Sequence, residues 1–410
     1  MLGILVRKEI ADNLLSYKFF VVILLSAVLI FTSLFVMGRD YKSRVADYQL
    51  IKPKPDQAIA VLPPNPLSVF AKGLEDSLAR SYEPSVIGIE ARTGRSSANT
   101  VFDFFPAPDF VYIVKVVLSL VALLFGFDRI SREREAGTLK LTLANPVSRG
   151  ALLFGKWLGN LFSLAVPFFL ITGIGLAILH LDPSFRMTPS GYGRLALILL
   201  LSLFYMALFL SLGLFVSAVT RRSATSLVVL LLLWALMVFV LPNTGTLLAR
   251  QIVEVPSSRA VMEKRNQIWT REVLKTFSDR GNRTSHFQTM NEEIKRLEED
   301  YRNRVDRQVR LAKALNRISP AAGFVYTATE MAGTGIGEDS RLKREVVRYR
   351  DQVLQTGTLE NNMAPAFSYK YRPLGEVMAE GGLFDIAWLL VFNVFFFAAG
   401  FVRFLRYDAR

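Results

Sequence analysis

Two glycine-rich stretches are the first places at which this sequence suggests chemistry. The stretch from Gly150 to Lys156, GALLFGK, matches the opening of a phosphate-binding P-loop, whose backbone amides and lysine hold phosphates. Trp157 stands where that motif needs a Ser or Thr hydroxyl for Mg²⁺, and no strand pattern precedes it. The stretch from Gly333 to Gly337, GTGIG, lacks the strand and helix that surround a dinucleotide site. We therefore expect Lys156 to mark the end of a membrane span and the second stretch to form an external loop.

Residues that perform acid–base, nucleophilic or metal chemistry are scarce. The chain has no cysteine and two histidines, His180 and His286, so disulfides and thiolate metal sites are excluded. His286 is the only candidate base in the segments expected outside the membrane, and no nucleophile-elbow or metal motif accompanies it. A membrane-bound hydrolase is therefore the least favoured function. We expect no catalytic, cofactor-binding or metal-binding residue in this chain.

Two polar residues interrupt apolar stretches and are candidates for a pathway or for contacts between helices. Lys115 lies about seven residues inside its stretch, where a bare ammonium in lipid costs about 2.5 to 3.5 kcal/mol. Its side chain must either extend to the membrane surface or face a polar interior. Asn393, near the middle of the last apolar stretch, is suited either to hydrogen bonding between helices or to lining a path.

The segment from Asp128 to Lys156 is the most informative charged stretch. It reads DRISREREAGTLKLTLANPVSRGALLFGK, and its charged run and its Asn-Pro pair cannot enter lipid. We expect a short amphipathic helix followed by a turn at the membrane surface. A segment that only anchors would be more uniformly basic, whereas four residues here offer charges of both signs to a protein partner: Arg132, Glu133, Arg134 and Glu135. The alternative is that these are ordinary juxtamembrane charges.

Apolar stretches that can cross a bilayer must position these residues. The 410-residue chain is 51% hydrophobic and 20% charged, whereas an average soluble domain has about 25% charged residues. Its mean hydropathy is +0.32, so a single soluble enzyme domain is excluded. A helix of about 20 residues spans about 30 Å of hydrocarbon. The stretches that meet this requirement are 19–37, 107–127, 157–179, 195–219, 224–242 and 383–402.

The placement of Lys and Arg in the short segments predicts the topology. Six spans put both termini on one side, together with the charged segment 128–156, and basic residues are concentrated in these parts. The short connection on the opposite side, 181–192, carries only Arg186. By the positive-inside rule, both termini are expected in the cytoplasm. The net charge of +14 is therefore interpreted as topology and not as a nucleic-acid surface.

Two long segments, 38–106 and 244–381, are then expected outside the cytoplasm. In the first, five prolines between Pro53 and Pro66 break any helix, so we expect a small, irregular domain with a strand or two. The second segment is expected to be mostly helical.

Within the second segment, apolar residues recur every three or four positions from Ile294 to Ile318, which predicts a helix. The stretch 257–277 is suited to fold back on this helix as a hairpin, and a further helix is expected from Ser340 to about Gln355. The hairpin is either a solvated structural element or a docking surface for a substrate or partner.

Small residues and proline in the spans predict how the helices pack. Pro167 is expected to kink or break the third span. Ser211, Gly213 and Ser217 would let another helix approach the fourth span closely.

The charged segment also resembles a known family. The pattern from Ser131 to Thr138, SREREAGT, followed by Pro146-Val-Ser-Arg149 and by Gly155-Lys156, resembles the signature of type-2 ATP-binding-cassette (ABC) exporter permeases. The stretch from Leu2 to Ser16 is similar to the amphipathic N-terminal helix of that family. The resemblance implies that Glu133, Glu135, Gly137 and Thr138, together with the neighbouring Arg132 and Arg134, form a coupling region that contacts a separate ATPase subunit.

The resemblance has further implications. The two large outer segments are similar to those of a branch with a large extracytoplasmic domain, related in pattern to permeases that serve copper-enzyme maturation and gliding motility. The implied location is the bacterial cytoplasmic membrane. The implied partners are a cytoplasmic ATPase that holds ATP and Mg²⁺, a second permease copy, the lipid bilayer and an extracytoplasmic protein; nucleic acid is not among them.

The expected fold is an all-α polytopic membrane protein with six transmembrane helices. A mostly helical extracytoplasmic domain follows the fifth helix and a smaller irregular one follows the first. The expected function is that of the permease subunit of an ATP-driven exporter. The alternative is a membrane anchor or scaffold that transmits force from an ATPase without substrate crossing. Beyond the spans, the expected boundaries are 1–18 for the N-terminal helix, 38–106 and 244–381 outside, 128–156 for the coupling segment and 403–410 for the cytoplasmic tail.

Overall fold

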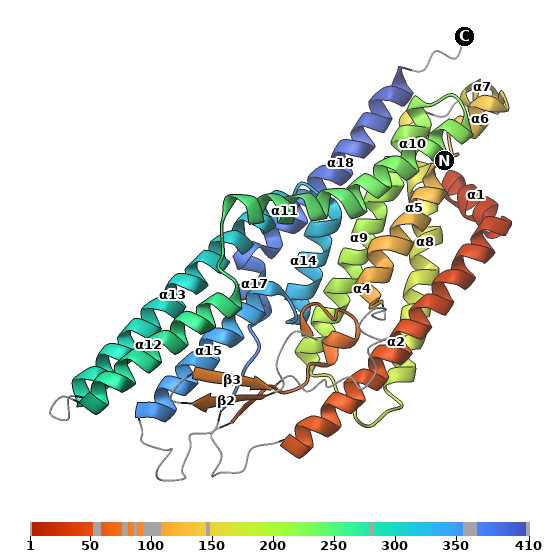
Figure 1. The fold of residues 1–410 in the computed structure, drawn as a ribbon. Coiled ribbons are helices and arrows are strands. Elements are labelled where there is room, and N and C mark those ends of the chain that lie inside the picture. The colour runs from red at the N-terminus through yellow and green to blue at the C-terminus, as the bar shows by residue number, and fades with distance from the viewer. Residues whose placement is uncertain are drawn as a thin grey trace. The chain divides into compact units, whose positions relative to one another are not determined.

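The structure is a computed structural model, and it describes residues 2–51, 59–75, 81–85, 88–92, 108–144, 148–278, 283–355 and 367–406. Most of the described chain is helical (Figure 1). It forms two compact units, the first made of residues 1–234 and 323–410 and the second of residues 235–322.

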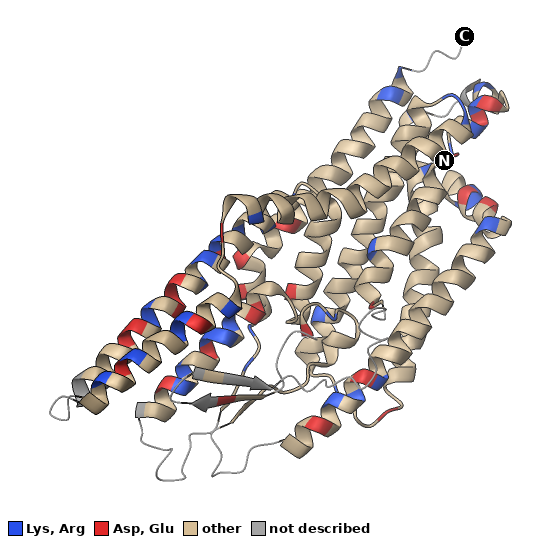
Figure 2. Cartoon of the chain, in the orientation of Figure 1, with Lys and Arg blue, Asp and Glu red and all other residues tan. Residues whose placement is uncertain are grey.

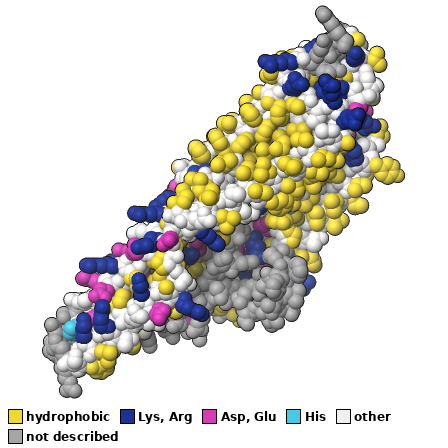
Figure 3. Space-filling model, turned by 45° about the horizontal axis from the view of Figure 1, so that its top comes forward, with side chains coloured by type: hydrophobic (Ala, Val, Ile, Leu, Met, Phe, Trp, Pro, Cys, Tyr) yellow, Lys and Arg dark blue, Asp and Glu magenta, His cyan; other side chains and the backbone are white. Residues whose placement is uncertain are grey.

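Six helical segments in the described ranges are long and apolar enough to cross a membrane. Charged side chains are sparse along them (Figure 2), and exposed hydrophobic side chains gather in one broad area of the surface (Figure 3). The prediction of an all-α polytopic membrane protein is confirmed. The segments are Tyr17–Ile51 (α2), Phe110–Glu135 (α4 to α6), Arg149–Leu179 (α8), Pro189–Val219 (α9), Ser223–Ile252 (α10 to α11) and Leu374–Leu405 (α17 to α18).

The first of these helices is longer than its apolar stretch. The expectation of an irregular segment from residue 38 was wrong at its start, because α2 continues as a helix to Ile51. Hydropathy marks where a chain leaves lipid, whereas a helix ends only where its backbone hydrogen bonds are interrupted. The polar part of α2 is tied by Arg44, whose guanidinium lies 2.8 Å from Asp40 and 3.0 Å from Glu75.

Three of the spans contain a π-helical turn: η3 (Val114–Leu118), η4 (Leu236–Val240) and η5 (Met378–Gly382). Such a turn displaces the regular hydrogen-bond pattern and frees a carbonyl for another partner. In η3, the carbonyl of Lys115 accepts hydrogen bonds from Ser119 Oγ at 2.6 Å and from Tyr205 Oη at 3.2 Å. By contrast, α8 continues through Pro167 without a break.

Helix α9 lies at the centre of the helical packing in the first unit, with many of its side chains buried. A Cβ atom on Gly126 of α5 (Ser119–Gly126) would come within 3.0 Å of the Gly213 Cα, so the two backbones touch. The hydroxyl of Ser211 on α9 donates to Asn393 Oδ1 of α18 (Leu383–Leu405) at 2.9 Å. The predicted close approach of other helices to α9 is confirmed at these positions.

The two long segments contribute to one small domain in the first unit. Three short strands, β1 (Ala60–Val61), β2 (Ser81–Ser85) and β3 (Gly88–Arg92), form an antiparallel sheet in which Ala60 faces Tyr82 and Tyr82 faces Ala91. Helix α15 (Ile336–Gln355) packs against the sheet. The shared core consists of Ala60, Tyr82, Leu342, Val346, Tyr349, Val353 and Tyr369. The strands agree with the prediction, but the two segments do not form separate domains.

The glycine-rich stretch Gly333–Gly337 comprises the turn after α14 (Pro320–Ala332) and the start of α15, and it binds the segment around Gly73. Thr334 is 1% exposed, and its hydroxyl donates to the carbonyl of Ala71 at 2.7 Å. The Leu74 amide donates to the Thr334 carbonyl at 2.9 Å. The structure thus places a tight, buried turn here, because the loop backbone binds the segment around Gly73. Its expected position outside the cytoplasm stays a prediction.

The second unit contains the predicted helical hairpin. Helices α12 (Ser258–Ser278) and α13 (Arg283–Asn316) pack against each other, and the turn between them lies outside the described residues. Ile294 is buried as predicted, whereas Phe277 is 73% exposed. Helix α11 (Leu241–Ile252) packs on the end of α13, where the Asn316 amide donates to Thr246 Oγ1 at 3.1 Å.

Candidate functional site

The charged segment folds into two short helices: α6 (Ser131–Glu135), which ends the second spanning segment, and α7 (Thr138–Ala144). The sequence pattern predicts only one helix and a turn here. The break between the two helices is at Gly137, whose φ of +73° lies in the left-handed region that L side chains rarely adopt. Glycine permits this sharp change of direction, so a second helix can follow.

Helix α6 is attached to the C-terminal end of α9. The hydroxyl of Ser217 accepts hydrogen bonds from the amides of Ile130 and Ser131, both at 3.0 Å. The guanidinium of Arg134 donates to the carbonyls of Thr220 at 2.8 Å and Ala218 at 3.0 Å. These bonds satisfy carbonyls that the end of a helix leaves free. A displacement of α6 must therefore move the end of α9 or break these bonds.

A buried lysine links α6 to two other helices. The ammonium of Lys156, on α8, lies 2.7 Å from a carboxylate oxygen of Glu133 on α6 and 3.0 Å from one of Glu9 on α1 (Leu2–Leu14). The Lys156 side chain is 4% exposed. A charge so deeply buried is tolerated only when it is paired and hydrogen-bonded. Lys156 thus holds α1, α6 and α8 together at one point.

Polar side chains extend this cluster between α1 and α8. The amide of Asn13 donates to Asn160 Oδ1 at 2.9 Å and to Ser163 Oγ at 3.0 Å. Arg129, just before α6, donates to Asn13 and lies 3.5 Å from Glu9. The two asparagines are fully buried. The bonds of Asn13 to Asn160 and Ser163 join α1 to α8, so the polar cluster specifies how these two helices meet.

Glu135 closes the contact between α6 and the fifth span. Its carboxylate accepts hydrogen bonds from the hydroxyl of Ser223 at 2.7 Å and from the Ser223 amide at 3.2 Å. Ser223 is the first residue of α10 (Ser223–Ala235), so Glu135 caps that helix from outside.

The six predicted coupling residues therefore fall into two groups. Glu133 and Arg134 are half-buried and Glu135 is exposed, and all three bond to other helices of this chain. Arg132, Gly137 and Thr138 are exposed. On α7, Lys140 is also exposed and Leu141 is 71% exposed, whereas Leu139 is buried. A surface that a partner can reach is formed by Arg132, Gly137, Thr138, Lys140 and Leu141.

The same end of the first unit contains α1 and the C-terminal end of α18. Leu5 of α1 and Phe404 of α18 belong to one apolar cluster that also includes Leu139, Leu153 and Ala218. Figure 1 shows α1, α6, α7 and the end of α18 at this end of the unit. Six spans that cross the membrane in alternate directions were predicted to bring both termini to one side, and this arrangement agrees with that prediction.

Lys115 and Asn393 lie away from the charged cluster. The Lys115 ammonium is 5.9 Å from the centre of the Tyr112 ring, so the side chain runs back toward the start of its span. Asn393 donates to the carbonyl of Phe204 at 3.2 Å and accepts from Ser211 Oγ at 2.9 Å. Trp157 in turn donates to Ser211 at 2.9 Å. The two bonds of Asn393 join α18 to α9, as expected for a residue that hydrogen-bonds between helices.

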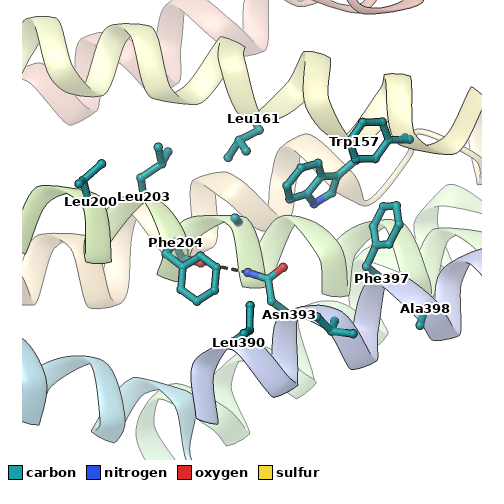
Figure 4. A pocket seen from close by; sticks show the side chains of 12 residues that line it. Trp157, Leu161, Leu200, Leu203, Phe204, Leu390, Asn393, Phe397 and Ala398 are labelled. Carbon is teal, nitrogen blue, oxygen red and sulfur yellow. Dashed lines mark hydrogen bonds between the residues drawn. The ribbon is translucent and has the colours of Figure 1, made fainter. Parts of the chain in front are cut away.

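Asn393 also borders a groove of about 490 Å³ between α8, α9 and α18 (Figure 4). Its walls are almost wholly apolar, with Trp157, Phe204 and Phe397 around the asparagine. Within the described ranges, no group of three His, Asp or Glu residues is placed to hold a metal ion.

Sequence reasoning missed Glu9, Asn13, Arg129 and Asn160 as members of the cluster. The sequence does contain a pattern that indicates a polar contact. Glu9 and Asn13 are one helical turn apart on α1, and Lys156 and Asn160 are one turn apart on α8. Two such polar rows predict a polar contact, but the sequence does not say that the rows face each other.

Comparison with known proteins identifies the family. The sequence profile of a family described as ABC-2 family transporter protein matches residues 4–409. The chain belongs to this family. It is 46% identical over 70 residues to a probable ABC transporter permease protein NosY of Pseudomonas aeruginosa, a match that covers 16% of this chain and 25% of the relative. It is 34% identical over 95 residues to a protein of the same description from Stutzerimonas stutzeri, which covers 23% and 34%.

The chain thus spans about a quarter to a third of the length of these two relatives. The family and the six apolar helices make it a multi-pass membrane protein of the ABC-2 transporter family. The resemblance seen in the coupling segment is confirmed at the level of the family.

Proposed function

We propose that this ABC-2 family protein is the permease subunit of an ATP-driven exporter. In this proposal, a separate ATPase binds α6 and α7 and moves the spans. The observation that carries the proposal is the triad of Lys156, Glu133 and Glu9. It ties the short helix beside the exposed surface to two other helices, α1 and the spanning helix α8.

The ATPase would bind the surface of Arg132, Gly137, Thr138, Lys140 and Leu141. Leu141 is the apolar anchor, since a leucine that is 71% exposed beside a glycine turn can enter a pocket of a partner. Arg132 and Lys140 at the rim favour an acidic groove and guide its approach. The paired residues Glu133, Arg134 and Glu135 transmit the movement, because their partners lie on α8, α9 and α10.

ATP can shift the spans only by the difference in binding energy between the two states of the ATPase. A rigid link between the docking surface and the spans is therefore required. Helix α6 supplies such a link, because it bonds to four other helices within the described chain: α1 through Lys156, α8, α9 and α10.

Purification from native membranes tests the docking surface. A tagged chain is expected to bring an ABC ATPase with it, identified by mass spectrometry. Leu141→Asp should weaken this association about tenfold or more, because a charge replaces an apolar anchor. Leu50→Asp, at a leucine that is 85% exposed on α2, is the matched control. Undiminished recovery of the ATPase with Leu141→Asp would contradict the proposal.

We also propose that the protein lies in the bacterial cytoplasmic membrane with both termini in the cytoplasm. The absence of native cysteine permits a direct test. Single cysteines replace two exposed residues, Arg221 between α9 and α10 and Ser278 at the end of α12. In intact cells, an impermeant maleimide should label Ser278→Cys and not Arg221→Cys. The reverse pattern would place α6 and α7 on the wrong side for an ATPase.

A further inference from the structure

A second groove, of about 1010 Å³, lies between α2, α8 and the loop that follows α8. Its floor is formed where the two helices touch. A Cβ atom on Gly38 of α2 would come within 2.7 Å of Leu179 Cδ2, and one on Gly175 of α8 would collide with Leu34. The two helices therefore lie in close contact at these glycines, which both line the groove.

The lining of this groove changes from apolar to cationic along α2. Phe31, Phe35 and Ile178 form the apolar part, and Phe35 and Ile178 are more than half exposed. Arg39 and Lys42 border the other part, three residues apart and so on the same side of the helix. The change occurs just beyond the apolar stretch 19–37, where the chain passes from hydrocarbon to the headgroup region.

Arg39 and Lys42 differ in their interactions with the rest of the chain. The guanidinium of Arg39 lies 5.8 Å from the centre of the Phe35 ring, and in the described part of the chain it forms no ion pair. The ammonium of Lys42 lies 2.8 Å from Asp182 in the loop after α8. Lys42 and the Ser184 amide hold the pKa of Asp182 at about 2, so this carboxylate is ionised at neutral pH and competes for Lys42.

An apolar wall beside two cations favours a phospholipid over a purely apolar molecule or a small soluble anion. The groove near Asn393 has almost wholly apolar walls and so distinguishes no lipid from another. A small soluble anion would use only Arg39 and Lys42 and leave the aromatic wall uncovered. A phospholipid has a phosphate next to its acyl chains, and the groove has two cations next to an apolar wall.

We propose that the groove between α2 and α8 is a binding site for one anionic phospholipid. The phosphate binds Arg39 and Lys42 through charge-assisted hydrogen bonds. One acyl chain lies along Phe31, Phe35 and Ile178. This site is independent of the ATPase surface, which lies at the other end of the spans, so either proposal can fail without the other.

The experiment is a lipid titration of the purified full-length protein followed by native mass spectrometry. The probes are phosphatidylglycerol, phosphatidylcholine and glycerol 3-phosphate. Phosphatidylglycerol should bind tightest and with a stoichiometry of one for the strongest site. The double variant Arg39→Gln/Lys42→Gln should weaken this binding about a hundredfold, since each charged hydrogen bond contributes roughly a factor of ten.

Two further variants make the test specific. Arg186→Gln removes an exposed arginine from the same loop region that does not line the groove, so it should leave binding unchanged. Asp182→Asn releases Lys42 from its carboxylate and should strengthen binding of phosphatidylglycerol. Misfolding would decrease lipid binding and cannot increase it. The Asp182→Asn result therefore tests the site even if the double variant is destabilised.

Three results would contradict the lipid site. Equal affinity for phosphatidylcholine would mean that the site does not select an anionic headgroup. Equal affinity for glycerol 3-phosphate would mean a site for a free anion with no role for the apolar wall. Unchanged binding in both Arg39→Gln/Lys42→Gln and Asp182→Asn would place the lipid elsewhere.

Discussion

The ammonium of Lys156 lies 2.7 Å from a carboxylate oxygen of Glu133, although the two residues are 23 positions apart and belong to different helices. Glu9 completes the triad from α1 at 3.0 Å. A lysine that resembles the phosphate-binding residue of a P-loop is in fact a structural cation. Its role is to neutralise two carboxylates at the point where α1, α6 and α8 meet.

Replacement of Lys156 by methionine should strongly destabilise the protein. It leaves Glu133 without its cation and Glu9 with only Arg129, at 3.5 Å. Removal of one partner from a buried ion pair costs about 3 to 5 kcal/mol. Thermal unfolding in detergent measures the loss. Lys8→Met, at an exposed lysine on the same helix as Glu9, should have little effect.

The triple variant Lys156→Met/Glu9→Gln/Glu133→Gln provides the decisive comparison. It removes the charge imbalance, so it should recover much of the lost stability. If the single variant is as stable as the native protein, the triad does not hold the helices together.

Two neighbouring arginines of α6 should respond in opposite ways. Arg132 is exposed, so Arg132→Glu should weaken association with the ATPase and leave thermal stability unchanged. Arg134 donates to the carbonyls of Ala218 and Thr220, so Arg134→Ala should destabilise the protein by about 1 to 3 kcal/mol. Pull-down and thermal unfolding on the same two preparations separate the effects. Loss of stability in Arg132→Glu would show that this residue is also structural.

Gly137→Ala should disturb the turn between α6 and α7. The φ of +73° at this position costs an L residue about 1 to 2 kcal/mol. No steric clash contributes, because nothing described lies within 4 Å of the added Cβ. Gly173→Ala, inside α8 and equally open, is the control and should be neutral or stabilising. Equal unfolding temperatures for both variants would mean that the left-handed turn is not required.

The small domain shared by the two long segments is tested at Gly73. Its φ is +52°, and an added Cβ would collide with the carbonyl of Thr334. Gly73→Ala should therefore separate the two segments and expose them to limited proteolysis, at a cost of about 1 to 3 kcal/mol. Gly193→Ala, which has no described neighbour within 4 Å, should leave the cleavage pattern unchanged. Resistance of Gly73→Ala to the protease would mean that the segments fold independently.

The hairpin of the second unit should lose stability in acid. Glu272, whose side chain is 2% exposed, accepts a hydrogen bond from Lys275 at 2.8 Å, and this bond, with that from Arg271, lowers its pKa. A lowered pKa stabilises the folded state above the unfolded pKa, near 4.5, and this contribution disappears as the pH falls through the lower folded value.

Thermal unfolding of the native protein should therefore occur at lower temperature as the pH falls below about 4.5. Glu272→Gln should be less stable at neutral pH and should show a smaller pH dependence. Glu263→Gln, at an exposed glutamate on the same helix, is the control. Identical pH profiles for Glu272→Gln and the native protein would remove the role assigned to this carboxylate.

Apolar length and charge pattern determine much of this fold. The six stretches of about 20 apolar residues can become only spanning helices, because backbone amides in lipid must bond within their own segment. The period of three and four between Ile294 and Ile318 likewise predicts α13. The motif from Ser131 to Thr138 is sufficient to indicate the family.

The tertiary structure decides which polar residues meet. Sequence periodicity places Glu9 and Lys156 each on one face of a helix, but the rotation of one helix against another depends on the packing of all its neighbours. Contacts such as Asn65 with Ala332 and Thr334 with Ala71 join positions more than 260 residues apart. Such long-range pairings are set by the sum of many small packing energies, so no local pattern encodes them.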